Sequence, residues 1–523
     1  MSSEMAETSI LLPQAVLTDG EAKAPLWDVA IRIDGDCIAE IGHAGDIVAA
    51  HPKAEIIDLA DCVVMPGLVN AHQHGRGLSA MQQGGEDEYF ELINAARTAR
   101  RSRGSAPVAP RHEVQSPGSA PIVALACAEM LRNGVTCTIQ ANLYFDGEDY
   151  ESELRSVLRA YVESGIRACV CVGAQDQGWI VYPQADEPAF LAGLPDDMRD
   201  DLSRIPRTAY AGDAPSTIAL MDRLLADYHD HPRIRLLYGP GGPQWLTDKS
   251  FTAMAEAARG QGVGFHFHCL ETRAQQAALQ RIYPEGVMAH LDGLGVLGPQ
   301  TSLAHCVFLT ADDIELAARR GVTLVRNPGS NLRLHNGSAP LAKFLAYGAR
   351  VAIGTDNRAL EEGEDLLKEV RLAQALARSA EWGDPPAPNA RQLFSMATAN
   401  GAHAAGFGTE VGVLEARRKA DLIALSLHHI RGTYLDAGVS LVDAVIGRAE
   451  GRDVRMTMVD GRIVYRDGVL QSMDENEVRT KALTAADASH QTMAPKELRN
   501  LQTLRNHLAA HYRNMTAAQR PRR

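Results

Sequence analysis

The stretch "MPGLVNAHQHGRG", from Met65 to Gly77, is an apolar run of strand length that ends in two histidines. His72 and His74 are one residue apart, and Gly75 follows them at once. Successive side chains of a strand point to opposite faces, so residues two apart share a face. Both imidazoles therefore lie on one side of the predicted strand, and the glycine lets the chain turn sharply after them.

Seven further apolar runs of strand length follow, each separated from the next by helix-length segments rich in alanine and leucine. Apolar strands that alternate with helices are typical of a parallel sheet covered on both faces. Eight such units within residues 65–405 predict an α/β fold, a TIM-like (β/α)8 barrel with insertions. The later runs are GVTCTIQAN, GIRACVCVGA, RIRLLYGPGG, GVGFHFHCLE, TSLAHCVFL, GVTLVRNPGS and RVAIGTDN.

Both ends of the chain have a different texture, with short alternating strands and turns. Asp34-Gly35 and Asp460-Gly461 each stand between apolar runs, which is a hairpin signal. Chain ends often lie close together in folded domains. Residues 1–64 and 406–474 are therefore predicted to form one small β-sandwich domain beside the barrel.

Two segments fall outside this plan. Residues 475–523 are predicted to form a helical extension that packs on the body or on a neighbouring subunit, because Leu501, Leu504 and Leu508 form an apolar stripe. Residues 99–121 are rich in arginine, proline and serine and are too polar for a core. This insert is either a linker or a lid over the catalytic end of the barrel, since it follows the first strand.

The composition excludes several classes of protein. The net charge is −13 and the isoelectric point about 5.8, which argues against nucleic acid or an anionic membrane as a partner. No apolar run approaches the ~20 residues of a membrane span. The first residues have no basic segment of a signal peptide, and the eight cysteines are scattered. We therefore expect free thiols and a cytoplasmic protein.

Polar residues also end several of the later strands. His266, His268 and Glu271 end the fifth strand, His305 ends the sixth, and Asp356 ends the eighth. Active sites of such barrels lie where the strands end. Burying these groups without partners is costly, and a divalent metal removes that cost. Three imidazoles and one carboxylate suit Zn²⁺, Fe²⁺, Co²⁺ or Mn²⁺.

Several motifs in one order resemble a known family. Five stretches resemble sequence motifs of the amidohydrolase superfamily: "PGLVNAHQH", "HFHCLET", "NPGSNLRL", "GTDN" and "KADLIAL". The resemblance runs from about residue 9 to residue 470. It is to the branch that contains cytosine deaminase-like, adenosylhomocysteine or thiomethyladenosine deaminase-like and triazine chlorohydrolase-like enzymes.

The resemblance implies roles for particular residues. His72, His74, His268 and Asp356 match the metal ligands, and Asp356 also matches the residue that takes a proton from water. Glu271 matches the proton-carrying glutamate, and His305 matches a histidine that contacts substrate or the attacking water. Family members with two metals use a lysine at the end of the fourth strand, which here reads "LLYGPGGPQWLTDKS". Lys249 comes too late, so one metal is expected, with Zn²⁺ preferred over the alternatives.

The expected reaction is hydrolytic attack on an sp² carbon of a small molecule. Glu271 favours deamination of an amino-substituted N-heterocycle, because such a ring must be protonated. Cleavage of an amide, urea or carbamothioate bond, or of a C–Cl bond, is the alternative. A non-enzymatic relative is disfavoured, since the chain keeps all four ligands together with Glu271 and His305. A homo-oligomer, dimer or tetramer, is also expected.

Six residues at the predicted rim are candidates for substrate contact, and five of them have an alternative role. The alternatives are a turn for the fourth-strand pair, support of a ligand or a fifth metal ligand for the fifth-strand histidine, and helix capping for the seventh-strand asparagines. The candidates are Gln244, Trp245, His266, Asn327, Asn331 and Asn357.

Overall fold

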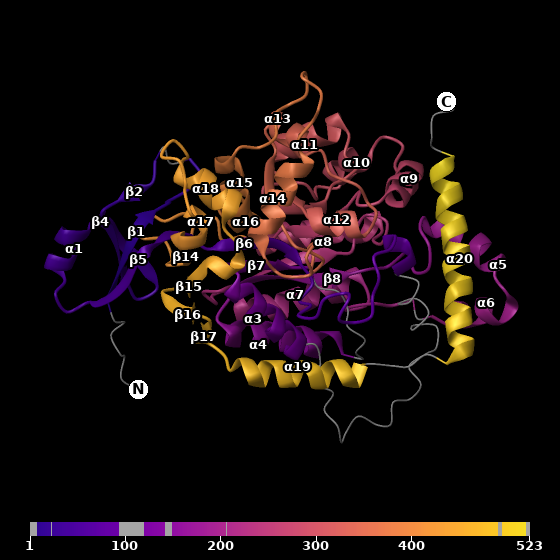
Figure 1. Cartoon of the computed structure of the whole chain (residues 1–523). Helices are drawn as coiled ribbons and strands as arrows, with labels where there is room; N and C mark the ends of the chain where they lie inside the picture. Colours follow the sequence, from indigo (N-terminus) through magenta and orange to yellow (C-terminus); the bar gives the residue numbers. More distant parts are fainter. Residues whose placement is uncertain are drawn as a thin grey trace.

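Eight parallel strands in chain order form the central barrel of the protein (Figure 1). The computed structural model describes residues 8–21, 24–93, 120–141, 149–205, 207–489 and 494–518. Almost every residue of the eight strands is buried, as their continuous apolar sequence predicts. The strands are β6 (Leu68–Gln73), β7 (Val135–Gln140), β8 (Arg167–Ala174), β9 (Ile234–Pro240), β10 (Phe265–Cys269), β11 (Thr301–His305), β12 (Thr323–Arg326) and β13 (Arg350–Ile353).

The barrel closes between its first and last strands without a regular ladder. The backbone N–H of Asp356, just after β13, donates to the carbonyl of His72 in β6 at 2.9 Å. The N–H of Thr355 donates to the side-chain oxygen of Asn70 at 3.1 Å. Polar side chains thus complete the closure where main-chain pairing stops.

Helices surround the barrel, and several begin at residues that cap them. Thr310 caps α11 with a complete capping box, and Gly321 ends that helix with φ 72°. The helices between the strands are α3 (Ala120–Arg132), α4 (Tyr150–Ser164), α5 (Glu187–Ala192), α6 (Asp196–Ser203), α7 (Ala214–Tyr228), α8 (Asp248–Gln261), α9 (Arg273–Ile282), α10 (Val287–Gly293), α11 (Ala311–Arg320), α12 (Pro328–Arg333) and α13 (Leu341–Ala346); after β13 come α14 (Leu366–Leu376), α15 (Ala390–Ala397) and α16 (Ala399–Ala404).

The two ends of the chain share a second sheet, at the left of Figure 1. Its strand order is β17-β16-β15-β14-β5-β1-β3-β4, with β2 paired to β1, and β14 from the late segment is antiparallel to β5 from the early one. The two predicted hairpin turns connect β3 to β4 and β15 to β16, so both are confirmed. The elements are β1 (Thr8–Val16), β2 (Leu26–Trp27), β3 (Val29–Asp34), β4 (Cys37–His43), α1 (Ala44–Ala50), β5 (Glu55–Pro66), β14 (Leu422–Ser426), α17 (Leu427–Arg431), α18 (Leu441–Arg448), β15 (Val454–Val459), β16 (Arg462–Arg466) and β17 (Val469–Leu470).

One glycine joins the two sheets. Gly67 is the single residue between β5 and β6. A Cβ atom at this position would overlap the side chain of Thr136, so a larger residue does not fit. The chain therefore passes from the chain-end sheet straight into the strand that carries His72.

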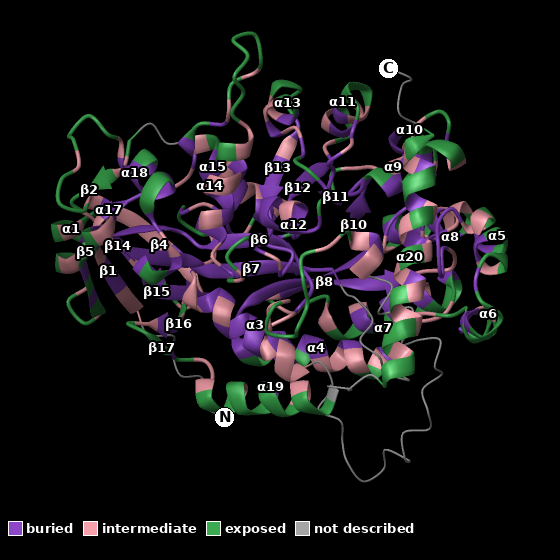
Figure 2. Ribbon diagram, turned by 45° about the vertical axis from the view of Figure 1, so that its right-hand side comes forward, coloured by how far each residue is buried: buried purple, intermediate pink, exposed green. Residues whose placement is uncertain are grey.

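The C-terminal extension consists of two helices that lie on the body of the same chain. These are α19 (Glu475–Ser489) and α20 (Pro495–Ala517), and Figure 2 shows that α20 keeps one exposed face. The other face of α20 buries Leu504 and Leu508 in a hydrophobic cluster with residues that follow β8 and with α9. Leu501 is only partly buried there. The predicted apolar stripe is thus confirmed, and it packs against the catalytic end of the barrel.

Three further predictions concern the insert after the first strand, the cysteines and membrane spans. Of the predicted insert, residues 99–119 lie outside the described residues, and α3 begins at Ala120. All eight cysteines are free thiols. Within the described ranges, no helix combines the length and apolar character needed to cross a membrane.

Candidate active site

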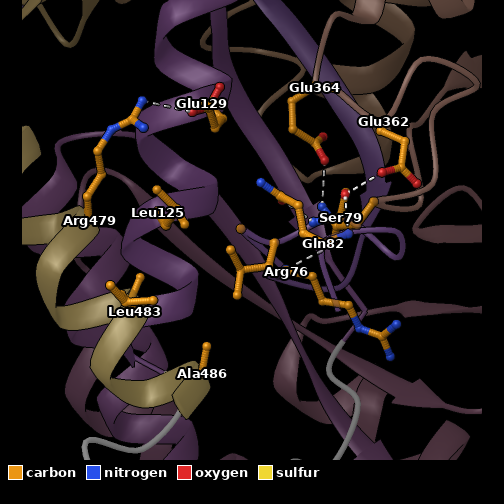
Figure 3. A pocket seen from close by; sticks show the side chains of 15 residues that line it. Arg76, Ser79, Gln82, Leu125, Glu129, Glu362, Glu364, Arg479, Leu483 and Ala486 are labelled. Atoms are coloured by element: carbon orange, nitrogen blue, oxygen red, sulfur yellow. Dashed lines mark hydrogen bonds and ion pairs between the residues drawn. The ribbon is translucent and has the colours of Figure 1, made fainter. Parts of the chain in front are cut away.

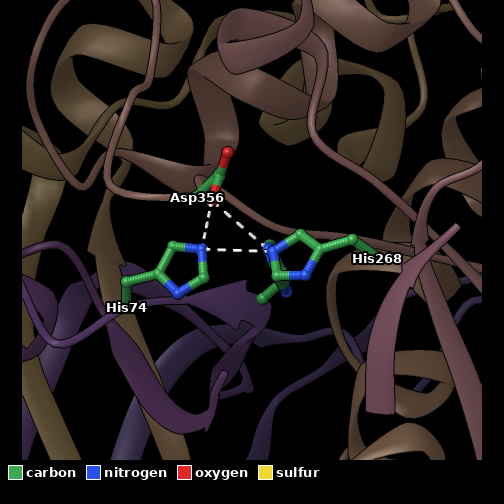
Figure 4. A group of neighbouring side chains, drawn as sticks. His74, His268 and Asp356 are labelled. Atoms are coloured by element: carbon green, nitrogen blue, oxygen red, sulfur yellow. Dashed lines mark hydrogen bonds and ion pairs between the residues drawn. The ribbon is translucent and has the colours of Figure 1, made fainter. Parts of the chain in front are cut away.

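Four side chains from three strand ends meet at the mouth of the barrel. The nitrogen and oxygen atoms that His72, His74, His268 and Asp356 offer all lie within 4.8 Å of one another. Figure 4 shows the imidazoles of His74 and His268 and the carboxylate of Asp356 turned towards one another. Oδ1 of Asp356 lies 2.9 Å from Nε2 of His74 and 3.3 Å from Nε2 of His72. The structure therefore brings together the four residues expected to bind a metal.

Two backbone carbonyls determine the protonation of His74 and His268. Nδ1 of His74 lies 2.7 Å from the carbonyl oxygen of Ala141, and Nδ1 of His268 lies 2.7 Å from that of Gly241. A carbonyl only accepts, so in each neutral ring Nδ1 carries the proton and Nε2 keeps a lone pair.

The resulting lone pairs need a cation between them. The Nε2 atoms of His74 and His268 are 3.4 Å apart, and the Asp356 carboxylate faces them. Two lone pairs and an anion at these distances repel one another. Three imidazole nitrogens and one carboxylate oxygen fit a divalent transition metal, so the residues present suit such an ion.

His266 supports His72 from behind. Its Nε2 lies 2.7 Å from Nδ1 of His72, and its Nδ1 lies 2.7 Å from the hydroxyl of Ser302. When His72 donates to His266 and His266 to Ser302, Nε2 of His72 keeps its lone pair towards Asp356. Burial lowers the pKa of His72 to about 4 and that of His266 well below its usual value. Both rings are therefore neutral at pH 7.

Asp356 is held as a carboxylate in a strained turn. Burial by itself would raise its pKa, but the adjacent His72 and His74 side chains hold the pKa well below its usual range. The hydroxyl of Ser330 donates to its Oδ2 at 2.5 Å. Asp356 and Asn357 both have left-handed backbones, with φ of 57° and 49°. Such conformations are costly for these residues and persist only where surrounding contacts enforce them.

A closing network of four polar residues enforces that turn. It consists of Asn70, Thr355, Asn357 and Glu364, and all four are buried. Glu364 accepts hydrogen bonds from the Thr355 hydroxyl at 2.6 Å, from the Asn357 amide at 2.8 Å and from the Asn70 amide at 3.3 Å. The side-chain oxygen of Asn357 accepts the backbone N–H of His74 at 2.7 Å. The closing network thus ties the end of β6 to the turn that carries Asp356.

Glu271 is a buried carboxyl beside the histidine cluster. Burial raises its pKa to about 7; nearby His305 lowers the value, and Asp356 and Glu91 raise it. The Asn336 amide donates to its Oε1 at 2.9 Å. Gln275 accepts its backbone N–H at 2.8 Å and donates to its Oε2 at 3.3 Å. A carboxyl with such a pKa can carry a proton at neutral pH.

His305 is oriented by Asn331. Nδ1 of His305 lies 2.8 Å from Oδ1 of Asn331 and 3.4 Å from the amide of Asn327. The shorter contact places the proton on Nδ1, so Nε2 has a lone pair, and it finds no hydrogen-bond partner in the described part of the chain. Asn327 is the N-cap residue of α12, but its side chain makes no capping bond.

The other substrate-contact candidates lie around this centre. Gln244 is buried, and neither polar atom of its side chain has a partner among the described residues. The Trp245 ring packs against Tyr182, with centroids 5.8 Å apart. Lys249 lies in α8, away from the end of β9. Asn357 belongs to the closing network described above.

A separate cavity of about 570 Å³ lies outside the four-residue cluster. Figure 3 shows it between α3, α19 and the loops that follow β6 and β13. Arg76, Asn357 and Glu364 line it, but His72, His74, His268 and Asp356 do not. It therefore borders the back of the closing network rather than the catalytic face.

Sequence reasoning did not single out several residues that hold the site. Ser330 and Asn336 stand in or beside the quoted stretch "NPGSNLRL", and Gln275 is four residues after Glu271, in the first turn of α9. These spacings are signals that a closer search would detect. Asn70 and Glu91 show no local signal, because their partners are remote in the chain. Thr355 and Glu364 are nine residues apart, but their contact with Asn70 links them to the first strand.

Comparison with known proteins agrees with this geometry. A model described as "Amidohydrolase family" matches residues 63–464. The 5-methylthioadenosine/S-adenosylhomocysteine deaminase of Moorella thermoacetica is 32% identical over 452 residues, which cover 86% of this chain and 92% of that protein. The 5'-deoxyadenosine deaminase of Methanosarcina mazei is 32% identical over 457 residues, 87% of this chain and 92% of that protein. A solved adenosine deaminase from Xanthomonas campestris with bound zinc superposes with a TM-score of 0.74 at 25% identity, over 92% of this chain and 98% of that one.

Proposed function

This chain belongs to the amidohydrolase family, and from that premise we propose its substrate class, its metal and the residues that act. Amidohydrolases are metal-dependent, and this chain is a hydrolase of carbon–nitrogen bonds other than peptide bonds. Its reaction is hydrolytic deamination of an N-heterocycle. The proposal concerns which heterocycle is used and how the site works.

We propose that one divalent ion, Zn²⁺ in preference to Fe²⁺, Co²⁺ or Mn²⁺, is held by His72, His74, His268 and Asp356. The facing lone pairs of His74 and His268 support this set. A single ion is favoured because Lys249 lies in α8 rather than at the end of β9. When bound, such an ion would lower the pKa of water to about 7 and so would supply a nucleophile at neutral pH.

The chain's own residues then move the protons. Asp356 is kept as a carboxylate, so it accepts a proton from the attacking water. Glu271 gives a proton to the ring nitrogen next to the attacked carbon, while Asn336 and Gln275 hold its two oxygens. His305 presents Nε2 towards the oxygen that adds to the ring, because Asn331 fixes its other nitrogen. Asp356 then passes the proton it took from water to the amino group, and the proton of the added hydroxyl returns to Glu271. The C–N bond breaks, ammonia leaves, and an oxo group stands in place of the amino group.

The proposed substrate is the adenine ring of an adenosine derivative modified at the 5' position. The single observation that carries deamination is the buried, protonatable Glu271 beside the four-residue cluster, since ring protonation is what deamination needs. The names of the two curated relatives support the adenosine class. Gln244, whose two side-chain polar atoms find no partner among the described residues, is proposed as a contact to the substrate.

The test combines metal analysis with a substrate panel. Elemental analysis is expected to find one Zn²⁺ per chain. Ammonia release is expected from 5'-deoxyadenosine, 5-methylthioadenosine or S-adenosylhomocysteine and not from phenylurea or chlorotriazine compounds. Release of aniline or chloride without ammonia would contradict the proposal, as would two tightly bound metals per chain. Assembly into a dimer or tetramer and a cytoplasmic location stay predictions, and light scattering tests the first.

A further inference from the structure

A second buried carboxylate, Glu91, lies close to Glu271 but has no part in the proposed chemistry. It follows β6 along the chain and is 8% exposed. Its Oε1 accepts two hydroxyl hydrogen bonds, from Tyr182 at 2.7 Å and from Thr272 at 2.5 Å. Both donors come from segments that follow other barrel strands, β8 and β10. Glu91 thus joins three loops at the catalytic end of the barrel.

The contact with Thr272 leads directly to Glu271. The Thr272 hydroxyl donates to Glu91 and accepts the backbone N–H of Gln275 at 3.0 Å, which caps α9. Gln275 in turn makes two hydrogen bonds with Glu271. Glu91, Tyr182, Thr272 and Gln275 therefore form a rim network that ends on the carboxyl of Glu271. Each link is a short contact between buried groups.

Helix α20 covers the outer side of the rim network. The Tyr182 and Tyr512 rings pack with centroids 5.1 Å apart, and the Tyr512 hydroxyl accepts the Tyr182 backbone N–H at 3.4 Å. Arg505 of the same helix pairs with Glu88 at 2.8 Å, three residues before Glu91. This helix lies beyond residue 464, where the match to the family model ends.

We propose that Glu91 is a positioning residue for Glu271, and that α20 keeps Glu91 and Tyr182 in place. Glu91 does not touch the reacting atoms in this scheme. It holds Thr272 and the start of α9, and through them it sets where the Glu271 carboxyl lies. The inference rests on the proposed role of Glu271 as the proton donor.

Two substitutions of Glu91 distinguish the effect of its hydrogen bonds from the effect of its negative charge. Both hydroxyls donate to the same oxygen of Glu91, so Glu91→Gln keeps an acceptor there and removes only the charge. Glu91→Ala removes both. The titratable groups that face Glu271 are His305, Asp356 and Glu91. Losing the Glu91 charge lowers the pKa of Glu271, so Glu91→Gln should move the pH profile of turnover downward without a large loss at the optimum.

The experiment measures kcat, KM, zinc content and thermal stability of the full-length zinc enzyme, with ammonia release as the assay. Glu91→Ala is expected to lower kcat by an amount that approaches about 10²-fold, the usual effect of a ~1 Å misplacement. KM and zinc content should change little, and Glu91→Gln should restore most of kcat. Arg513→Ala, on the exposed face of α20, is the matched control and should behave as the parent.

A double-mutant cycle with Glu271→Gln decides whether Glu91 acts through Glu271. In that background Glu91→Ala should have no further effect on kcat. An equal loss in both backgrounds would overturn the inference, as would an unchanged kcat in Glu91→Ala or equal damage in Glu91→Gln. Normal activity of Glu271→Gln alone would overturn the proposed proton donor and this inference with it. If Glu91→Ala does not fold, Tyr182→Phe removes one of the two hydroxyls, and an unchanged kcat there would also overturn the inference.

Discussion

The closing network and the rim network support opposite sides of the same site. Each centres on a buried glutamate, Glu364 in the first and Glu91 in the second, and burial raises the pKa of both. Glu364 holds the turn of Asp356 and the backbone after His74 through Asn357. Glu91 holds the start of α9 and thereby Glu271.

The two networks differ in where their residues come from. The closing network joins the ends of the first and last strands, so its geometry follows from the closing of the barrel. The rim network joins three loops and is covered by α20, which lies outside the residues matched by the family model. The comparison teaches that the metal side is tied to the fold, whereas the proton side also depends on an appended helix.

The largest effect is expected from Asp356→Asn. This substitution removes the proposed metal ligand whose turn the closing network holds. Zinc content should fall sharply and turnover by at least about 10³-fold, because without the metal the pKa of water is no longer lowered to about 7. Elemental analysis and ammonia release measure both. The rim network is untouched, so near-normal zinc content in this variant would show that the carboxylate is not a ligand.

Glu271→Gln should produce the next largest effect, on the rim side alone. Turnover is expected to fall about 10²-fold to 10⁴-fold, the range for loss of general acid–base catalysis. Zinc content should match the parent, since Glu271 is not among the four clustered residues. Loss of zinc in this variant would show that Glu271 also supports metal binding, which would contradict the separation of the metal side from the proton side.

Glu364→Gln should weaken zinc binding about 10-fold to 100-fold, as expected for a residue that orients a metal ligand. Glu364 accepts amide hydrogen bonds at both oxygens, from Asn357 at one and from Asn70 at the other, so in either orientation the NH2 introduced by this substitution faces a donor. Competition with a chelator measures the affinity, and excess zinc should restore much of the turnover. Glu361→Gln is the control, because Glu361 is exposed and forms its ion pair with Lys368 at the surface. Equal zinc affinity in both variants would show that the closing network does not contribute to metal binding.

The smallest effect concerns pH. Burial raises the pKa of Glu271 from its usual 4.5 to about 7. The carboxyl acts as a donor, so it must be protonated, and kcat/KM should be constant below this pKa and fall as the pH rises through it. The expected fall is about tenfold per pH unit for one proton. Glu271→Gln should lose this limb from its profile; a limb that persists unchanged would assign the titration to another group.

Much of the architecture follows from the sequence because its signals are local. Continuous apolar runs predict buried parallel strands, and the period of two places His72 and His74 on one face. Hairpin dipeptides at both ends of the chain predict turns that the chain-end sheet contains. The family motifs then indicate His268, Glu271, His305 and Asp356 as site residues. In the structure these side chains lie together at the catalytic end of the barrel.

Other features depend on contacts that no local pattern records. Glu364 is 294 residues from Asn70, and Glu91 is 181 residues from Thr272, yet each pair is joined by a hydrogen bond. The roles of Asn331 and Asn357 likewise rest on partners elsewhere in the fold. The sequence left substrate contact or helix capping open for Asn331, and for Asn357 it predicted substrate contact.

By itself, then, the sequence determined the barrel, the chain-end sheet and the types of residue at the strand ends, because hydrophobic period and turn chemistry act over a few neighbouring residues. Only the tertiary structure decided which buried carboxylates support the site and that α20 covers its rim. The physical reason is that a buried charge must find its hydrogen-bond partners in space, and the closing of the barrel brings those partners from distant parts of the chain.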